Sequence, residues 1–347
     1  MEYKGKNVWQ EDASAADAYR RQYVAGIKDY IKNRNLECKN KRKVFLNPEE
    51  LIKNPEKFRD MYKEMLGINQ FLENGMTSAE MIYVGKDDIC RIYRLTVKVT
   101  DEIPFYAMLL IPHGIDKCPL AIVQHGGWGT PELCCDMNGK NNYNHMAQRV
   151  LERNIAVLAP QLMLWTTEEK ETARAHPIEF SRNDIDKSLK RFGTTITALE
   201  IAGIIKCVDY VCRLPEIEDD NIAMIGLSYG GYFTLHTMAI DTRIRAGYTA
   251  GCFNDRDVYE WYDWCYFGSA LRFQDAEVAA LCAPRKLYIQ IGKTDEVFDY
   301  HSSIPEIERV REYYQAYGNE ENFRYSIWEG GHTISYDKEG YDFIFPV

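Results

Sequence analysis

The stretch 226–231 reads Gly-Leu-Ser-Tyr-Gly-Gly, with Ser228 at its centre. The mostly apolar run 221–225 precedes it and predicts a buried strand, and residues 232–240 after it predict a helix. A serine on a tight turn between a strand and a helix is typical of a nucleophile elbow. The glycines fit this turn because a strained backbone leaves no room for side chains beside it. We interpret Ser228 as a candidate nucleophile.

Outward from this turn, short apolar runs alternate with helical patterns. This alternation predicts an α/β protein with a doubly wound, mostly parallel sheet. The alternating pattern of residues 82–112 adds antiparallel strands at the N-terminal side of the sheet, joined by a turn near 100–102. The other strands are expected at 120–124, 155–160, 246–250, 286–291 and 323–328, and the other helices at 143–153, 194–213 and 304–317.

We expect two parts in the chain: an N-terminal helical extension over residues 1–80, and a catalytic domain over residues 81–347. A helix from Ser14 to Leu36, with tyrosines and isoleucines at helical spacing, is part of the extension. We favour a cap packed on the core, and a lid or an oligomer contact remains an alternative. Two long connections, 161–193 and 251–283, are expected to act as insertions that form a cap.

The composition excludes several classes of partner. A net charge of −10 argues against a nucleic-acid surface and against binding to anionic membranes, and no apolar run is long enough for a membrane span. The ten cysteines show no C-x-x-C spacing, so no zinc or redox motif is indicated. Free thiols and an N-terminus without the apolar stretch of a signal peptide predict a cytoplasmic protein.

A serine hydroxyl needs a general base, and on this type of fold the base follows the acid in the chain. His332 follows the last predicted strand on a Gly-Gly loop, which suits a base that must reach the serine. His236 lies within the helix after the elbow, and His301 lies just before a helix. Both positions favour structural roles, so we expect His332 to be the base.

The acid that orients the base is expected after strand 286–291, because active sites of open α/β sheets form at the carboxyl ends of strands. Asp295 is the best candidate in that loop. Glu296 and Asp299 are close enough to be mistaken for it, and Asp255, after the preceding strand, is a second place for the acid.

Acyl transfer also needs hydrogen-bond donors for the oxyanion. The backbone N–H of Tyr229, directly after the nucleophile, is the first expected donor. The loop that begins His125-Gly126 follows an earlier strand, and in it we expect Gly127, and next to it Trp128, to supply the second. We expect His125 to shape this loop by hydrogen bonds, since no partner stands at metal-ligand spacing, and we expect no metal and no cofactor.

Together these motifs resemble the α/β-hydrolase superfamily, in the branch of dienelactone-hydrolase-like proteins, acetyl xylan esterases and prolyl-oligopeptidase-type domains. The resemblance covers about residues 85–347 and implies Ser228 as nucleophile, Asp295 as acid and His332 as base. The dienelactone hydrolases proper use a cysteine where this chain has Ser228, which disfavours that activity. The helical N-terminus is unlike a β-propeller, which disfavours a peptidase.

The resemblance implies a serine carboxylic-ester hydrolase acting on a small-molecule ester through an acyl-enzyme. Three tryptophans in or near the insertions, Trp165, Trp261 and Trp264, are expected either to line the substrate pocket or to form the core of the insertions. Sugar rings stack on aromatic faces, so an acetylated carbohydrate is a reasonable substrate. A serine peptidase or aminopeptidase and a catalytically inactive binding protein are the alternatives, and a homo-oligomer remains open.

Overall fold

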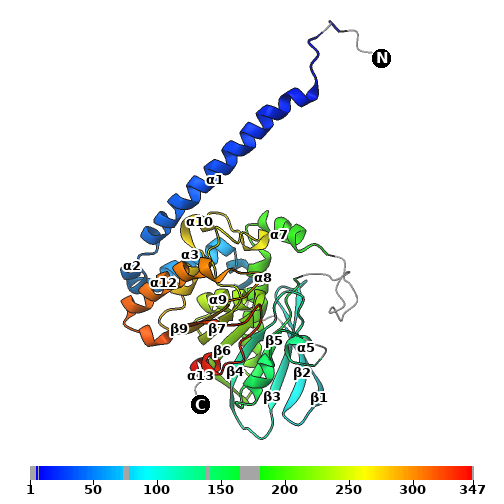
Figure 1. The fold of residues 1–347 in the computed structure, drawn as a ribbon. Helices are drawn as coiled ribbons and strands as arrows, with labels where there is room; N and C mark the ends of the chain where they lie inside the picture. Colours follow the sequence, from blue (N-terminus) through cyan, green and yellow to red (C-terminus); the bar gives the residue numbers. More distant parts are fainter. Residues whose placement is uncertain (1–4, 7, 73–77, 138–140, 165–179, 346–347) are drawn as a thin grey trace.

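The computed structural model describes residues 5–6, 8–72, 78–137, 141–164 and 180–345. Nine strands form one sheet in the order β1-β2-β3-β5-β4-β6-β7-β8-β9 (Figure 1). From β5 to β9 all neighbouring strands are parallel, whereas β1, β2 and β3 join the sheet by antiparallel pairing. The strands are β1 (Ala79–Lys86), β2 (Cys90–Lys98), β3 (Pro104–Pro112), β4 (Cys118–Gln124), β5 (Ala156–Pro160), β6 (Ile217–Leu227), β7 (Ile244–Ala250), β8 (Lys286–Gly292) and β9 (Phe323–Trp328).

Helices cover both faces of this sheet, as the predicted doubly wound class requires. Because successive side chains of a strand point to opposite faces, Ile122 and Met224 belong to one core, and their neighbours Val123 and Ile225 belong to the other. The first face is covered by α8 (Ile196–Val211), α9 (Tyr229–Ile240), α11 (Asp275–Ala280) and α12 (Tyr300–Tyr317). The second is covered by α5 (Pro131–Cys134), α6 (Met146–Leu151) and α13 (Glu339–Ile344). The fold class predicted from the sequence is confirmed.

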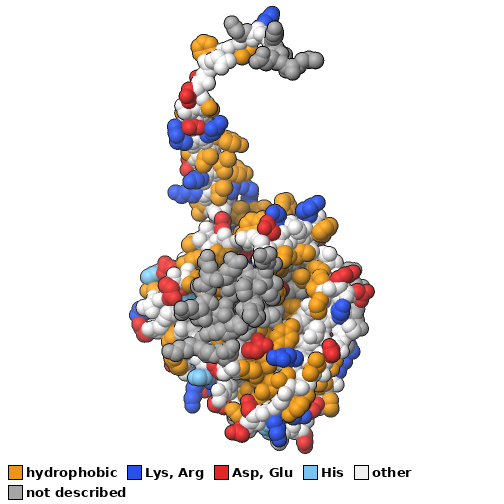
Figure 2. Space-filling model, turned by 90° about the vertical axis from the view of Figure 1, so that its right-hand side faces the viewer, with side chains coloured by type: hydrophobic (Ala, Val, Ile, Leu, Met, Phe, Trp, Pro, Cys, Tyr) orange, Lys and Arg blue, Asp and Glu red, His pale blue; other side chains and the backbone are white. Residues whose placement is uncertain are grey.

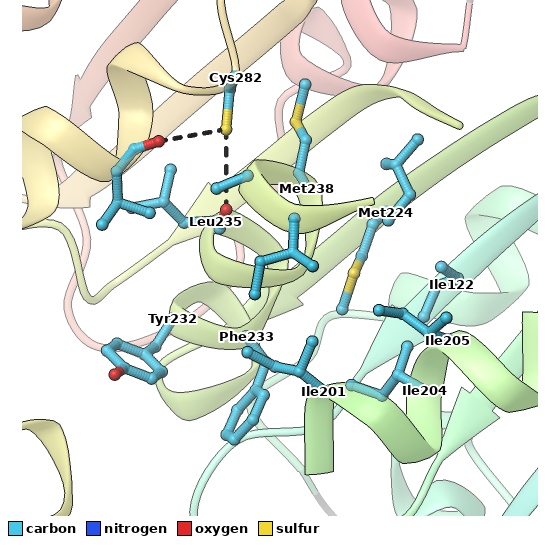
Figure 3. Packing of buried hydrophobic residues seen from close by; sticks show 14 of the residues in the cluster. Ile122, Ile201, Ile204, Ile205, Met224, Tyr232, Phe233, Leu235, Met238 and Cys282 are labelled. Atoms are coloured by element: carbon cyan, nitrogen blue, oxygen red, sulfur yellow. Dashed lines mark hydrogen bonds between the residues drawn. The ribbon is translucent and has the colours of Figure 1, made fainter. Parts of the chain in front are cut away.

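The larger core lies between the sheet and α8 and α9. Figure 3 shows Ile201 and Ile204 of α8 and Phe233 of α9 beside Ile122 and Met224 of the strands. These side chains are completely buried, and each contributes about 1.5–3 kcal/mol by leaving water. This packing fixes α9, and therefore the turn that precedes it, against the centre of the sheet.

The N-terminal helices α2 (Pro48–Lys53), α3 (Pro55–Leu66) and α4 (Asn69–Leu72) join the same core. The side chain of Asn47 accepts a hydrogen bond from the Glu49 N–H, with Pro48 in the first turn, so α2 begins where the capping pattern predicts. Their buried side chains include Leu51, Phe58, Tyr62, Leu66 and Phe71. Residues 46–72 therefore share their core with the sheet and the helices that cover its first face.

Helix α1 (Asp17–Phe45), which follows the short η1 (Ala13–Ala16), behaves differently. It is longer than the predicted helix, and its first half projects away from the body of the protein (Figure 1). Residues 17–33 are exposed except for partly buried Asp17, so the expected packing of the extension on the core does not include this part.

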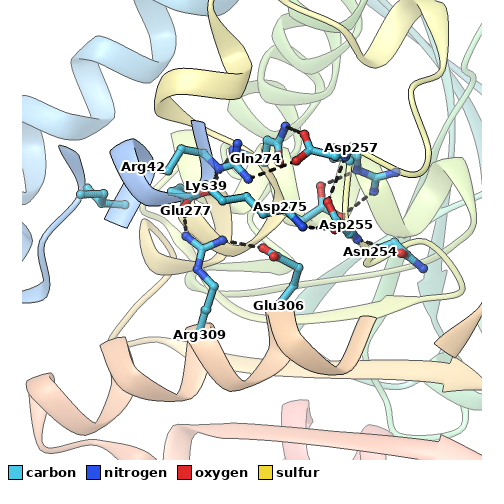
Figure 4. Close-up of polar contacts among 12 residues, drawn as sticks. Lys39, Arg42, Asn254, Asp255, Asp257, Gln274, Asp275, Glu277, Glu306 and Arg309 are labelled. Carbon is cyan, nitrogen blue, oxygen red and sulfur yellow. Dashed lines mark hydrogen bonds and ion pairs between the residues drawn. The ribbon is translucent and has the colours of Figure 1, made fainter. Parts of the chain in front are cut away.

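Charged side chains anchor the last turns of α1 to the body (Figure 4). Arg42 is completely buried, with its Nε 3.6 Å from a carboxylate oxygen of Glu277 on α11. Lys39 Nζ lies 2.5 Å from an oxygen of Asp255, in the loop that follows β7. The same group of charges includes Arg309 of α12, which pairs with Glu277.

The two long connections carry short helices, which sequence periodicity did not locate. These are α7 (Arg182–Lys190), η2 (Tyr262–Trp264) and α10 (Ser269–Arg272), with α11 at the end of the second connection, and η3 (Glu320–Asn322) precedes β9. Among the helices of the described ranges, none combines the length and the apolar character needed to cross a bilayer.

Candidate active site

Ser228 occupies the turn between the end of β6 and the start of α9. Its backbone has φ 59° and ψ −121°, a conformation that a side-chain-bearing residue adopts only under strain. The Ser228 N–H donates a hydrogen bond of 2.8 Å to the carbonyl of Ala250 at the end of β7, which holds the turn in place. The strained elbow expected from the glycine pattern is present at this serine.

Glycines allow two backbone segments to meet at the elbow. A methyl group on Gly126, in the loop after β4, would lie 2.7 Å from the Leu227 carbonyl oxygen and 3.1 Å from Ser228 Cβ. A methyl group on Gly230 would lie 2.8 Å from the carbonyl oxygen of His125. The loop that follows β4 and the nucleophile turn are therefore in direct backbone contact, so the predicted oxyanion loop lies beside Ser228.

The structure brings His332 and Asp295 together across the loops that follow β9 and β8. His332 Nδ1 lies 2.9 Å from Asp295 Oδ2, and the Asp295 side chain is completely buried. The other oxygen, Oδ1, accepts the N–H groups of Val297 at 2.8 Å and Phe298 at 3.1 Å. This carboxylate is fully engaged and fixed, and it holds the Nδ1 side of the imidazole.

The imidazole of His332 lies next to the elbow. A methyl group added to Gly251 would lie 3.1 Å from Leu227 Cδ1 and 3.3 Å from both Cε1 and Nδ1 of His332. The space between the His332 ring and the side chain of Leu227, which precedes Ser228, is therefore too narrow for a methyl group at ordinary contact distances. With Nδ1 directed at Asp295, Nε2 is the nitrogen left to act on the serine hydroxyl.

Two polar residues that sequence reasoning missed hold the histidine loop. The side-chain amide of Asn142 donates to the carbonyl of His332 at 2.9 Å. Gln290, buried on β8, donates to the Thr333 carbonyl at 2.9 Å and accepts the Ser335 N–H at 2.7 Å. A glutamine in the middle of the mostly apolar run 287–291 was the signal that could have identified this role.

The competing histidines lie elsewhere. His236 is buried in the core, with Nδ1 against the Tyr62 hydroxyl. His301 pairs with Asp299 at 2.7 Å, and both side chains are more than half exposed. Neither contact involves Ser228.

The competing carboxylates are also separate from His332 in the contacts of the described residues. Asp255 binds Lys39 and accepts the Asp257 N–H at 3.0 Å. Glu296 is exposed to solvent beside Asp295. Asp295 is the acid candidate whose carboxylate contacts the imidazole of His332.

The loop after β4 is shaped by hydrogen bonds on both sides. Gly126 donates its N–H to the Tyr143 hydroxyl at 2.9 Å, and its carbonyl accepts the Gly129 N–H at 3.2 Å, closing a turn over Gly127 and Trp128. Trp128 has φ 62°, the left-handed conformation that the third residue of such a turn can require. The turn thus presents the Gly127–Trp128 backbone beside the elbow, while the Gly126 N–H is already used.

His125 fixes the base of this loop. Its Nδ1 donates to the Gly126 carbonyl at 2.8 Å, and its Nε2 accepts the Leu162 N–H at 2.9 Å. Complete burial lowers the pKa of His125 to about 4, although the hydrogen bond to Gly126 opposes this shift. A neutral imidazole that both donates and accepts fits the predicted shaping role.

Tyr229 is the first residue of α9. The first N–H groups of a helix have no acceptor within the helix, and the helix dipole favours negative charge at this end. The Tyr229 hydroxyl donates to Asp263 Oδ1 at 3.0 Å. Burial, followed by the Asp263 charge, raises the pKa of this hydroxyl.

A buried ion network stands behind this contact. Arg182 of α7 binds Asp263 through Nε at 2.7 Å and binds both oxygens of Glu200 on α8, at 3.0 and 2.8 Å. Burial alone would lower the pKa of Arg182, but the charges of Glu200 and Asp263 raise it overall. The network connects both insertions to Tyr229, the residue that follows Ser228. The sequence did not indicate that Arg182, Glu200 and Asp263 form ion pairs, because charged residues are common throughout these segments.

Aromatic rings continue from the base to the elbow. Phe298 lies 5.9 Å from the His332 ring, Trp261 lies 5.4 Å from Phe298, and Tyr229 lies 5.3 Å from Trp261, all between centroids. Trp261 is half-buried and so retains accessible surface.

The other two tryptophans differ from Trp261. Trp264 is buried and stacks on Tyr232 of α9 with centroids 4.3 Å apart, which places it in the larger core of the protein. Trp165 lies outside the described residues. Within the described ranges, no group of three or more His, Cys, Asp or Glu residues is arranged to hold a metal ion.

The sheet order, the strained serine turn and the His–Asp pair at the carboxyl ends of the parallel strands define the α/β-hydrolase fold. Solved structures agree. A candidate acetyl xylan esterase from Bacteroides fragilis NCTC 9343 superposes with a TM-score of 0.65 at 14% identity, over 86% of this chain and 83% of its own. Methylesterase BT1017 superposes with a TM-score of 0.63 at 15% identity, over 87% of this chain and 65% of its own. A glucuronoyl esterase from Solibacter usitatus superposes with a TM-score of 0.57 at 14% identity, over 82% of this chain and 91% of its own.

Superposition at identities this low establishes the fold alone, and the neighbours include the acetyl xylan esterase branch that the sequence resembles. No family model and no curated protein matches the chain.

Proposed function

We propose that the protein is a serine hydrolase of carboxylic esters, with Ser228 as nucleophile, His332 as base and Asp295 as orienting acid. The observation that carries the proposal is the contact of 2.9 Å between His332 Nδ1 and the fully buried Asp295 carboxylate, next to a serine in a strained turn. A buried carboxylate bound to Nδ1 selects the tautomer whose Nε2 can accept a proton. Strain of this kind persists where the surrounding structure enforces it, and it is concentrated at functional sites.

The chemistry follows from these positions. His332 Nε2 takes the proton of Ser228 as Oγ attacks the ester carbonyl, and the oxyanion forms between the elbow and the loop after β4. The Tyr229 N–H and an N–H of the Gly127–Trp128 turn are the proposed donors. The C–O bond to the alcohol then breaks, and the imidazolium returns its proton to the leaving alcohol.

Water completes the cycle. His332 removes a proton from water as it attacks the acyl-enzyme, and the carboxylic acid leaves while Ser228 regains its proton. Every proton transfer in this scheme uses one imidazole nitrogen. The residues named are sufficient for the reaction.

The substrate that we propose is an ester of a carbohydrate, with a short acyl group such as acetyl. Two observations support this choice. Neighbours with the same fold carry the names acetyl xylan esterase, methylesterase and glucuronoyl esterase. Trp261 contacts the ring of Tyr229 and keeps accessible aromatic surface on which a sugar ring could stack.

Turnover of p-nitrophenyl acetate, of acetylated xylo-oligosaccharides and of an aminoacyl p-nitroanilide by the full chain tests this proposal. We expect ester turnover that Ser228→Ala lowers by about 10⁴-fold or more. Ser188→Ala is the matched control, because Ser188 is exposed on α7 and its hydroxyl donates to the Asp184 carbonyl of the same helix.

Three other outcomes would contradict the proposal. Ester turnover that survives Ser228→Ala would refute the mechanism. Faster cleavage of the anilide than of the esters would indicate a peptidase. A folded chain without turnover, in which a fluorophosphonate fails to label Ser228, would indicate an inactive binding protein.

A further inference from the structure

The projecting half of α1 carries an apolar surface that the described residues leave uncovered. Tyr19, Tyr23, Ile27, Tyr30 and Ile31, here called the α1 stripe, each stand three or four residues from another member and therefore share one face of the helix. Each is between 41% and 75% exposed. Figure 2 shows hydrophobic side chains along this helix outside the body.

The same side of the helix leads into an apolar groove at its base. The groove has a volume of about 890 Å³ and is lined by Val44 and Phe45 of α1 and by Phe267 and Leu271 at α10. Lys41, which also lines it, stands five full turns after Tyr23 and so lies directly in line with the stripe. Phe267 is 96% exposed. The stripe and the groove therefore lie on the same side of α1, and the paired side chains of Arg34 and Glu37 stand between them.

A surface of this kind needs a partner. The free half of α1, residues 17–33, is only slightly longer than the helices that are marginal in water by themselves. A contiguous apolar patch of more than a few hundred Å² typically marks an interaction site. The length of the helix and the exposure of its tyrosines therefore both indicate a bound state in which the stripe is covered.

We propose that this surface binds a second copy of the chain, with the two α1 helices antiparallel about a two-fold axis. The stripe lies toward the N-terminal end of α1 and the groove lies at its C-terminal end, on the same side. Antiparallel pairing therefore places the stripe of each subunit toward the groove of the other. This reciprocal contact is what a closed isologous dimer requires.

Charge favours the antiparallel orientation. Residues 31–45 carry six basic residues and one acidic residue, whereas residues 8–30 carry three basic and four acidic residues. A parallel pair would align the two basic halves, and an antiparallel pair places each basic half beside the slightly acidic half of its partner. The helix dipoles oppose each other in the same arrangement, which adds to the preference.

The available area is sufficient for a dimer. A buried aromatic side chain contributes about 150 Å² or more, and the aromatic members of the stripe and groove that are most exposed, Tyr19, Tyr23, Tyr30 and Phe267, are between 66% and 96% accessible. With the aliphatic members of the surface, this amounts to roughly 800 Å² per subunit, which is the typical contribution to a stable interface.

A lipid bilayer fits the surface less well. The groove beside α10 is concave and lies against the body of the protein, where a helix can enter and a flat membrane cannot. The chain carries a net charge of −10, so an anionic membrane would repel its body. A protein helix is the occupant that satisfies both parts of the surface.

Sedimentation equilibrium of the full chain from about 1 to about 100 µM tests the proposal. We expect a dimer for the wild type and a monomer for Y23A/I27A/Y30A. The control R21A/K28A/K32A removes three side chains from the opposite face with the same replacement residue and should remain dimeric. Hydrolysis of p-nitrophenyl acetate should stay within about twofold in both variants, which shows that each is folded.

Disulfide trapping tests the orientation. Cysteine introduced separately at Tyr30 and at Arg34 lies near the expected two-fold axis, so at least one of the two should give a cross-linked dimer under mild oxidation. Ser14→Cys at the helix start should give no more cross-linking than the wild type with its native cysteines. Efficient cross-linking through Ser14→Cys would refute the antiparallel arrangement.

The proposal is overturned if the wild type is monomeric throughout this range, or if Y23A/I27A/Y30A remains dimeric. It is also overturned if a monomeric wild type sediments with vesicles that contain phosphatidylserine, because the stripe would then be a membrane-binding face.

Discussion

Replacement of Asp295 by asparagine should abolish most of the activity and leave the fold intact. Asp295 Oδ1 accepts two backbone N–H groups, from Val297 and Phe298, and an asparagine oxygen can keep both. The amide nitrogen is then left facing His332 Nδ1. An amide nitrogen only donates, so Nδ1 has to become the acceptor, and the proton moves to Nε2. The nitrogen that should take the serine proton is then already protonated.

This change of tautomer is expected to lower kcat by about 10⁴-fold, which corresponds to about 5.5 kcal/mol in the activation free energy. The free energy of unfolding should change by no more than about 1–2 kcal/mol, because the side chain keeps its shape and most of its hydrogen bonds. The assay is kcat for p-nitrophenyl acetate, with urea unfolding measured on the same preparations.

Two matched substitutions make the test sharp. Asp299→Asn changes an exposed aspartate that precedes α12 and pairs with the exposed His301 in its first turn, and Asp255→Asn changes the alternative acid, which binds Lys39. Both variants should retain kcat within a few-fold of the wild type. The reasoning fails if Asp295→Asn stays within tenfold of the wild type, or if Asp255→Asn shows the large loss instead.

Three further effects should be measurable. Gly251→Ala adds a methyl group 3.3 Å from the His332 ring and should lower kcat at least tenfold, whereas Gly318→Ala has a similar φ of 68° and open space, and should cost about 1 kcal/mol of stability without loss of kcat. Tyr143→Phe removes the hydroxyl that accepts a buried N–H in the oxyanion loop, so urea unfolding should show a loss of about 1–3 kcal/mol and kcat should fall. The lowered pKa of His125, about 4, means that the unfolded chain binds more protons between roughly pH 6.5 and 4; the free energy of unfolding should therefore fall by up to about 3 kcal/mol as the pH drops through this window, and the imidazole NMR signals should titrate near pH 4.

The parts of the fold that the sequence predicts are those with strong local signals. Strands such as β4 and β5 are buried on both faces, so they appear in the sequence as short, mostly apolar runs. The elbow could be predicted because the tight backbone turn requires glycines beside the serine, and these glycines are visible in the sequence. His332 and Asp295 could be proposed because each follows a strand in the order that the fold imposes.

What escaped prediction depends on contacts between distant residues. Arg182 and Asp263 are 81 positions apart, and each looks like an ordinary surface charge until the chain is folded. Trp261 and Trp264 are three residues apart, yet one keeps accessible surface and the other stacks in the core, because no regular period governs that insertion. The periodicity of α1 correctly predicted an apolar face, but periodicity cannot tell whether the face is covered by the same chain or by another.

The anchoring of α1 bears on where this protein can be cut. Arg42 and Lys39 serve as counter-ions for carboxylates that belong to the catalytic part of the chain, Glu277 and Asp255. Deleting the whole helix would remove Lys39 from Asp255 and Arg42 from Glu277, and would leave Arg309 as the cation beside Glu277. A shortened protein that is meant to fold should therefore begin before Lys39, inside the helix, and the boundary near residue 80 is unsuitable for expression of the catalytic part alone.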